Sequence, residues 1–458
     1  MFKQKIRQIA AFFGKARANK PLLIIFGLWV ALVIFYRLFF QIRPYDTPDW
    51  FPISELYLTG FHKSGIIYLI AFWILLLVVL ANLKKINEWL VILTGWALIV
   101  LGNLMQGGFV KGFLEPFYAA GNQIYSDAIN VQNWVTWLAG FNANQLTFLG
   151  HTETHPPFAV LLHNIFLSPS NNQLATMAIG MSVLSMCTIP LLMVIFRLFQ
   201  MDVVKRKTIL LLFSVIPAVN IYSIICLDSV ILTTATIFLL GMIVLLRKPE
   251  KKLLGIALMV IGFITTSMLN YGVLFLLGAG GLAGIYEIIK SKKFTIFVGL
   301  LVCVLSFVGL YLILKYGFNY DYIQSFLIAS RQENIFSISF LYDIRNYGLT
   351  RFEDVSEIAL FLSFPILALL TKDVLNFKKN KDFYKKDHLA VAFSGILTLL
   401  FVFLIGTYKT GETTRSCLFI YPFLFLLLLN KDQDDFLWMV ILAAIQTSVM
   451  QIFFGFYW

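Results

Sequence analysis

Residues 64–106 read SGIIYLIAFWILLLVVLANLKKINEWLVILTGWALIVLGNLMQ, two long apolar blocks separated by a short turn that carries Lys84 and Lys85. Each block is long enough to cross the roughly 30 Å hydrocarbon core of a bilayer as a helix. The stretch therefore predicts two transmembrane helices joined by a basic loop. The same alternation of apolar block and short polar segment continues in both directions along the chain.

Extending this pattern predicts 13 transmembrane spans in a single transmembrane domain that covers residues 1–458. The expected bounds are 22–40, 64–82, 89–106, 173–199, 208–225, 229–246, 253–269, 271–288, 295–315, 356–371, 389–406, 417–430 and 436–454. Little sequence is left over for a large soluble domain. We therefore expect an all-α, polytopic integral membrane protein, since only helices and closed barrels satisfy the backbone inside a bilayer.

The composition supports the membrane assignment and argues against a nucleic-acid partner. Hydrophobic residues make up 59% of the chain and charged residues 13%, whereas soluble proteins carry about a quarter charged residues. The net charge of +12 comes from short basic runs between apolar blocks, which is typical of cytoplasmic loops. Membrane lipids are therefore the expected surroundings.

The distribution of Lys and Arg predicts the orientation. With the N-terminus inside, the inside segments hold 25 of the 36 Lys and Arg residues and the outside segments hold eight. This bias places the C-terminus outside. The abundance of Lys, Asn, Ile and Phe is typical of an AT-rich bacterial genome, so we expect the chain in a bacterial plasma membrane, in the cell envelope.

Two outside loops are long, residues 107–172 and 316–355, and long loops often carry function. The first contains a mainly apolar stretch, 158–169, that is too short to span and predicts an interfacial or re-entrant helix. The second is aromatic and mixed in charge, and could shape an acceptor site, although no spacing in it is diagnostic.

Asp127 begins the most informative part of the first long loop. The apolar residues after it share much of one helical face: Ile129, Val131, Trp134, Val135, Leu138 and Phe141. This pattern predicts an amphipathic helix on the membrane surface, with Asp127 in its first turn, where a carboxylate is favoured. Asp127 is either simply a helix-start acid or a general base at the water interface.

The motif His151-Thr-Glu-Thr-His155 follows in the same loop. Two histidines four apart would suggest a zinc pair on a helix, but Pro156 disfavours helical geometry at His155. Pro156 and Pro157 instead suit the opening of a new helix, with His155 at its N-terminus, where anions are attracted. We expect His155 and Glu153 to contact substrate, and we predict no metal or other cofactor, with a divalent ion left as an alternative. His163 on the following helix is expected to be packed.

Asp127 followed about 30 residues later by His155-Pro156-Pro157 resembles the C-type membrane glycosyltransferases (GT-C). The likeness is to the family 39 branch, with its protein O-mannosyltransferases and aminoarabinose transferases. It implies a polyprenyl-phosphate sugar donor and an acid in the first outer loop, here Asp127, as the catalytic base. Ala128 stands where the O-mannosyltransferases have a second acid, and the matching loop follows the third expected span, so the acceptor and the subfamily stay open.

Asp46 and Asp49 are rivals to Asp127 by position, because they lie in the outer loop after the first expected span. No His-Pro-Pro motif follows them before the next span. Trp50 stands beside them, and aromatic residues gather at membrane interfaces. We therefore expect these two acids to be interfacial.

Two further segments carry charges at expected outer span ends. Asp228 lies in ICLDSV, between the fifth and sixth spans, where a charge is costly unless it pairs or serves. The alternative is an interfacial helix cap. The segment TYKTGETTRSCLF carries Lys409, Glu412 and Arg415, and its Gly-Glu-x-x-Arg pattern resembles a late motif of bacterial GT-C enzymes. Arg presents a planar fork of donors that suits phosphate, although an ordinary exposed ion pair is the alternative.

These residues predict a glycosyltransferase that moves a sugar from a polyprenyl-phosphate donor to a hydroxyl of a glycan, lipid or protein acceptor outside the membrane. Asp127 would be its base, and Arg415, with Lys409, would hold the departing phosphate. The alternative is a transporter or flippase of lipid-linked sugars or related anionic lipids. A transporter should place charges near mid-membrane, and a third possibility, a scaffold subunit, should leave the candidate residues apart.

Overall fold

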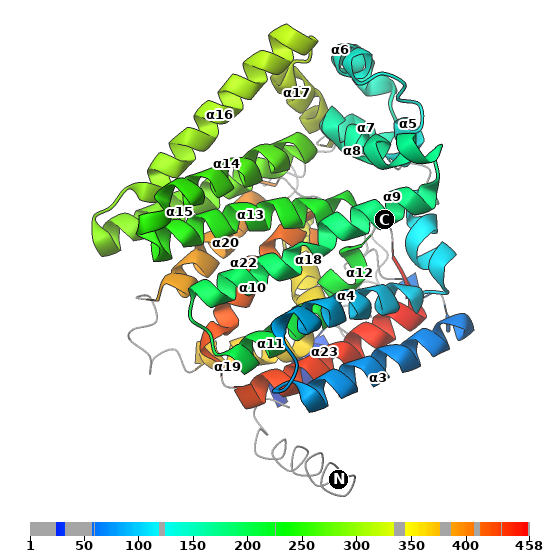
Figure 1. Cartoon of the computed structure of the whole chain (residues 1–458), viewed down its shortest axis with the longest axis vertical. Helices are drawn as coiled ribbons and strands as arrows, with labels where there is room; N and C mark the ends of the chain where they lie inside the picture. The colour runs from blue at the N-terminus through cyan, green and yellow to red at the C-terminus, as the bar shows by residue number, and fades with distance from the viewer. Residues whose placement is uncertain are drawn as a thin grey trace, which may run out of the picture.

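The computed structural model describes residues 24–32, 57–58, 60–118, 124–224, 226–333, 344–375, 386–406, 413–431 and 433–456, and these are almost entirely helical (Figure 1). The strands among them are β1 (Tyr57–Leu58) and β2 (Phe454–Gly455), which form one short antiparallel pair. This pair joins the segment before the second expected span to the end of the chain. The predicted all-α class is confirmed.

Within this described part, eight helices are long and apolar enough to cross a membrane. They are Lys63–Asn82 (η1, Lys63–Gly65, and α3, Ile66–Asn82), Leu174–Leu198 (α9, Leu174–Met186, and α10, Thr188–Leu198), α13 (Leu227–Arg247), Pro249–Leu269 (η6, Pro249–Lys251, and α14, Lys252–Leu269), Tyr271–Ser291 (η7, Tyr271–Val273, and α15, Leu274–Ser291), α16 (Thr295–Phe318), α20 (Asp387–Leu404) and α23 (Gln433–Phe453). The pair α18 (Ile344–Leu362) and α19 (Phe364–Leu375) makes a ninth only where the two helices are counted as one span. This pair is bent by 104° at Ser363, whose φ is 93°.

The other four predicted spans are not helices of that length in the described residues. The span 89–106 is the 17-residue α4 (Glu88–Leu104), and 417–430 is a 13-residue run built from η10 (Leu418–Ile420), α22 (Tyr421–Leu426) and η11 (Leu427–Asn430). The span 208–225 is divided between α11 (Val203–Val215) and α12 (Pro217–Tyr222), because Pro217 has no N–H to continue the helical hydrogen bonds. Of the span 22–40, only 24–32 is described.

The predicted amphipathic helix after Asp127 is wrong as one continuous element. The structure divides it into α5 (Tyr125–Ala128) and α6 (Trp134–Asn144). The cause is Asn133, which is extended and whose side chain accepts hydrogen bonds from the N–H groups of Val135 and Thr136. Asn133 is thus the N-cap of α6 and begins a new helix. Elsewhere in this loop lie η2 (Val110–Leu114), η3 (Glu115–Phe117), η4 (Gln145–Thr147), α7 (Gly150–Thr154) and η5 (Ser168–Ser170).

The prediction of a short helix after the paired prolines is confirmed. Helix α8 (Pro157–Leu167) begins at Pro157, with Pro156 at its N-cap. His163 is packed inside, as predicted, with Nδ1 2.7 Å from the carbonyl oxygen of Ala159. Burial lowers the pKa of His163 to about 4, so the ring is neutral at pH 7.

Helix α13 lies at the centre of the bundle and is almost wholly buried. It packs against α9, α10, α14, α15 and α16 (Figure 1). Its first turn carries Asp228 and its last turn carries Arg247. Asp228 and Arg247 therefore mark the two opposite ends of the bundle, at which the charged residues described below lie.

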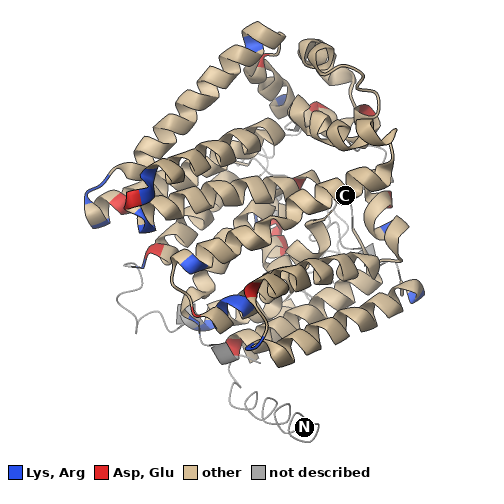
Figure 2. Cartoon of the chain, in the orientation of Figure 1, with Lys and Arg blue, Asp and Glu red and all other residues tan. Residues whose placement is uncertain are grey.

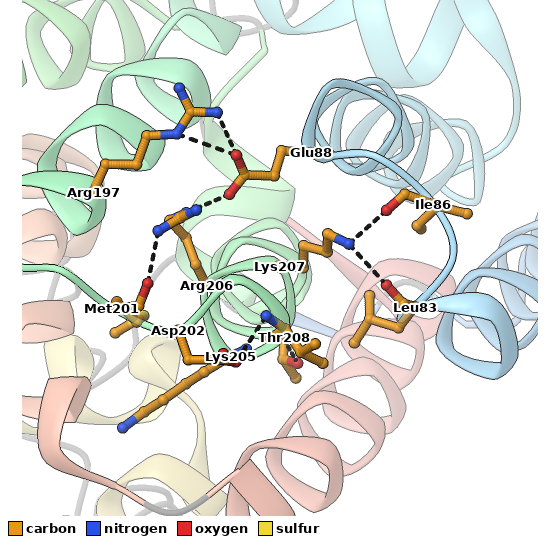
Figure 3. Close-up of polar contacts among 11 residues, drawn as sticks. Leu83, Ile86, Glu88, Arg197, Met201, Asp202, Lys205, Arg206, Lys207 and Thr208 are labelled. Atoms are coloured by element: carbon orange, nitrogen blue, oxygen red, sulfur yellow. Dashed lines mark hydrogen bonds and ion pairs between the residues drawn. The ribbon is translucent and has the colours of Figure 1, made fainter.

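A dense set of ionic contacts lies at the end of the bundle marked by Arg247. Glu88, at the start of α4, accepts hydrogen bonds from Arg197 and Arg206 (Figure 3). The side chain of Arg206 is 8% exposed and that of Glu88 12% exposed. These contacts connect the predicted inside segments 83–88 and 200–207.

Lysines of the same basic run bind backbone carbonyls of other elements. Lys207 donates to the carbonyl oxygens of Leu83, at 3.1 Å, and Ile86, at 2.5 Å, just after α3 ends (Figure 3). Lys205 donates to the carbonyl oxygen of Leu429 at 2.7 Å. Cations are favoured at such helix C-termini, where carbonyl groups lack intrahelical partners.

A second ionic centre connects the remaining basic segments. The buried carboxylate of Asp387, at the start of α20, accepts hydrogen bonds from Arg247 at 3.1 Å and from Lys290. Next to it, Nε2 of His388 lies 2.7 Å from the side-chain amide of Asn430. Parts of the predicted inside segments 83–88, 200–207, 247–252, 289–294 and 372–388 therefore lie at one end of the bundle. Asn430, just before the last inside segment, lies there too, and Figure 2 shows Lys and Arg residues gathered at this end.

Candidate functional site

Two of the charged residues selected from the sequence meet at the opposite end of α13. Arg415 lies on the short helix α21 (Thr413–Ser416) and its Nε is 3.6 Å from Oδ2 of Asp228. The side chains are 6% and 14% exposed. The N-cap of α13 is Cys226, so Asp228 is not the capping residue that the alternative interpretation required. Arg415 is buried, whereas the alternative of an ordinary ion pair placed it on an exposed surface.

Helix α18 holds α21 in place from the other side. Asp354 accepts a hydrogen bond from the hydroxyl of Thr413 at 2.6 Å, and Glu357 accepts one from the Thr413 N–H at 3.2 Å. Arg351 forms an ion pair with Asp354 at 3.0 Å. Asp354 and Glu357 are fully buried. The position of Arg415 therefore depends on carboxylates from a helix that is distant in the sequence.

Sequence reasoning missed this role of α18. The prediction ended an undiagnostic loop at 355 and began a span at 356, whereas α18 runs through that boundary. Arg351, Asp354 and Glu357 are spaced by three residues, which places them on neighbouring positions of one helical face. That spacing was the available signal.

Asp127 lies in the third position of the four-residue α5 and is half-buried. Its Oδ2 accepts a hydrogen bond from the N–H of Leu149 at 3.3 Å, and Leu149 is the N-cap of α7. Asn164 of α8 holds the same region by donating to the carbonyl oxygens of Ala128 and Val131. The Asp127 side chain is thus held by the start of α7, and the segment that follows it is held by α8.

His155 lies between α7 and α8 with an extended backbone. Its Nδ1 is 2.8 Å from the carbonyl oxygen of His151, which requires the proton on Nδ1. His155 therefore donates through Nε2 to an anion only in its doubly protonated form. Because α7 ends at Thr154, the two histidines do not share one helical face, and the described residues contain no group of three or more metal-ligating side chains.

Glu153 lies on α7, and its carbonyl oxygen accepts a hydrogen bond from the side chain of Gln145 at 2.8 Å. Gln145 also donates to the carbonyl oxygen of Ser325, on α17 (Tyr322–Glu333). Asn142 and Asp321 exchange two hydrogen bonds nearby. These hydrogen bonds join the two long loops that are predicted on one side of the membrane. Within the first loop, α5, which carries Asp127, packs against α8.

The candidate site has two halves, the segment from Asp127 to His155 and the pair of Asp228 and Arg415. Their helices are connected through shared packing partners. Helix α8, which follows His155, packs against α9 and α14, and both of these pack against α13, which carries Asp228. Lys409 and Glu412 lie outside the described residues. The structure thus brings Asp228 and Arg415 into contact. It places Asp127, Glu153 and His155 on or next to α5 and α7 of the first long loop, residues 107–172.

No family model, curated protein or solved structure matches this chain. What the chain does must therefore be inferred from its own residues and their arrangement.

Proposed function

We propose that the chain is a membrane glycosyltransferase that transfers a sugar from a polyprenyl-phosphate donor to an acceptor hydroxyl. The observation that carries the proposal is the contact between the buried Arg415 and the partly buried Asp228, two charges from distant parts of the sequence. Burying charged groups is costly, so such groups are found where they form ion pairs or take part in function. A guanidinium in a site with little water binds a lipid phosphate strongly.

The reaction follows from the separate chemistry of the two halves. Asp127 takes the proton of the acceptor hydroxyl while the acceptor oxygen attacks the anomeric carbon of the donor. The bond between that carbon and the phosphate oxygen breaks, and its electron pair stays on the phosphate. Arg415, assisted by Lys409, stabilises the phosphate as it leaves. Glu153, His155 and Glu412 contact the donor or orient these groups.

The proposed setting is a bacterial plasma membrane crossed 13 times, with the N-terminus inside and the C-terminus outside. The clustering of basic segments at one end of α13 supports this orientation, because basic loops stay on the cytoplasmic side. Asp228 and Arg415 then lie at the outer end of the same helix. The acceptor is a glycan, lipid or protein of the cell envelope.

One observation favours the alternative of a transporter or flippase for lipid-linked sugars. The pair α18 and α19 is a broken helix, and α18 carries the buried carboxylates of Asp354 and Glu357, with the partly buried Arg351 paired to Asp354. Broken helices with buried charges line the substrate sites of many transporters. Such a protein would move the donor between leaflets and leave its sugar bond intact.

The test is transfer of radiolabelled sugar from synthetic polyprenyl-phosphate donors by the purified chain, over a panel of envelope glycans, lipids and peptides. We expect transfer by the native chain and a loss of about 100-fold or more in Asp127→Asn, because a general base typically contributes that factor. Asparagine keeps an oxygen that accepts the Leu149 N–H, so the variant retains the local fold.

The control is Asp321→Asn, which changes a carboxylate in the neighbouring loop that already pairs with Lys315. This variant should transfer sugar at close to the native rate. Equal activity of Asp127→Asn and the native chain would remove Asp127 as the base. Donor movement across vesicles without any cleavage would replace the transferase with the transporter.

A further inference from the structure

The cations at the basic end of the bundle fall into two groups. Lys205, Arg206 and Lys207 bind carbonyls or Glu88 inside the structure. In contrast, the turns 248–252 and 292–293 carry lysines that point to solvent: Lys248, Lys251, Lys252, Lys292 and Lys293. We call these five residues the lysine surface.

The two turns of the lysine surface lie next to each other. Arg247 immediately precedes the first turn and Lys290 lies two residues before the second, and both bind the carboxylate of Asp387. Helices α14 and α16, which leave these turns, pack together. The five lysines therefore form one continuous surface instead of two separate clusters.

Few acids offset this surface. Asp387 is engaged by Arg247 and Lys290, and Glu287 is buried with its carboxylate bonded to the hydroxyl of Thr295 and the N–H of Ile296. Glu250 is exposed and lies 4.0 Å from Lys248. Among the described residues, the remaining four lysines have no side-chain ion pair, so the surface presents a strong positive charge.

Large apolar side chains lie immediately beside these lysines and are open to the surroundings. Leu253 is 77% exposed, Ile289 70% and Phe294 59%. Such exposure suits contact with hydrocarbon and is unfavourable in water. The lysines therefore lie at the height of the lipid headgroups, where the apolar core of the bilayer ends.

We propose that the lysine surface binds the phosphate headgroups of anionic phospholipids in the adjoining leaflet. Each lysine near an anionic membrane surface adds to the attraction between protein and membrane, and clusters of lysines at a span end recognise acidic lipids. The neighbouring apolar residues contact the acyl chains of the same lipids. A soluble polyanion would satisfy the charges but would leave Leu253, Ile289 and Phe294 in water.

The experiment titrates fluorescently labelled phosphatidylglycerol into the purified full chain in detergent, with labelled phosphatidylcholine as the reference lipid. The test variant is Lys251→Gln/Lys252→Gln/Lys292→Gln/Lys293→Gln. We expect the native chain to prefer phosphatidylglycerol, and the variant to bind it about tenfold more weakly or worse. The preference of the native chain should also fall at 0.5 M salt, at which the screening length is only about 4 Å.

The matched control is Lys63→Gln/Lys84→Gln/Lys85→Gln/Lys111→Gln, which removes the same charge from other surfaces. This control should keep native affinity for phosphatidylglycerol. Equal loss in both variants would show a net-charge effect and overturn the site, as would displacement of the labelled lipid by millimolar inorganic phosphate. None of the four test lysines holds another described residue, so native thermal unfolding of the test variant is expected and is checked alongside.

Discussion

At the scale of single residues, several charges of this protein depend on partners that are far away in the sequence. Glu88 shows this most clearly, because its carboxylate holds two arginines and one of them, Arg206, is almost fully buried. Removing one member of a buried ion pair leaves the other charge without compensation, which costs more than the pair itself contributes. Such residues therefore give the sharpest predictions on stability.

Glu88→Gln should lower the free energy of unfolding by about 3 kcal/mol, since Arg206 stays buried without a charged partner. Glu250→Gln is the control, because its pair with Lys248 is exposed and contributes less than about 1 kcal/mol. Chemical denaturation in detergent measures both. A Glu88→Gln protein as stable as the Glu250→Gln protein would contradict a stabilising role for the cluster.

The same carboxylate predicts an acid dependence. Burial alone raises the pKa of Glu88, but hydrogen bonds and charges from Arg206 and Arg197 outweigh it and hold the pKa below its ordinary value of 4.5. A carboxylate with a lowered pKa stabilises the fold fully above that ordinary value and loses this contribution as the pH falls through the folded-state pKa. The native chain should thus lose stability below pH 4.5 more steeply than Glu88→Gln does.

At the scale of helices, the sequence predicted starts and stops best where proline decides them. The paired prolines at 156–157 correctly predicted the start of α8. Pro217 breaks a predicted span, and its effect was masked by the apolar residues on both sides. Hydropathy reports where a segment lies more directly than whether its helix is continuous.

In the span broken at Pro217, the side chain of Asn220 forms hydrogen bonds that connect the two halves and the neighbouring helices. Asn220 donates to the carbonyl oxygens of Leu98 and Ser214 and accepts from Gln451. Helix α4 approaches closely at Gly102, where an added Cβ would lie 1.9 Å from the Asn220 Oδ1. No hydropathy pattern contains this contact, because it joins three separate spans.

Gly102→Ala should therefore destabilise the protein by about 1–3 kcal/mol, the usual cost of overpacking a tight core. Gly309→Ala is the matched control on α16, where an added Cβ meets nothing within 4 Å. Alanine is the better helix former, so this control should be neutral or stabilising by up to about 1 kcal/mol. Thermal unfolding that affects both variants alike would contradict the close approach.

At the scale of the whole molecule, long-range contacts group segments that the sequence separates. Lys and Arg counts already suggested which loops share a side, and the contacts of Glu88, Asp387 and His388 bring those loops together. The contribution of α18 to the candidate site was missed, because the position of a charge along the chain says little about which distant helix faces it. The pairing of Asp228 with Arg415 needed the folded structure for the same reason.

The proposed orientation predicts opposite labelling of two introduced cysteines. Ala143→Cys lies on the exposed surface of α6, and Lys251→Cys lies in the basic turn. In intact cells, a membrane-impermeant maleimide should label position 143 and leave position 251 unlabelled until the membrane is permeabilised. Of the four native cysteines, Cys226, Cys303 and Cys417 are buried and should contribute little background, and labelling of the partly exposed Cys187 is measured in the native chain and subtracted. Labelling of position 251 in intact cells would reverse the proposed sides.

The central claim is that Arg415, held beside Asp228, binds the donor phosphate. The most direct measurement is the dissociation constant of a polyprenyl phosphate for the native chain, Arg415→Gln and the exposed control Arg331→Gln. If Arg415→Gln unfolds, the double variant Asp228→Asn/Arg415→Gln, which removes both charges of the pair, is measured in its place. We predict binding about tenfold weaker or worse without Arg415, since a charge-assisted contact contributes about 1.5–3 kcal/mol, and native binding by Arg331→Gln. Native affinity without Arg415 would contradict the account.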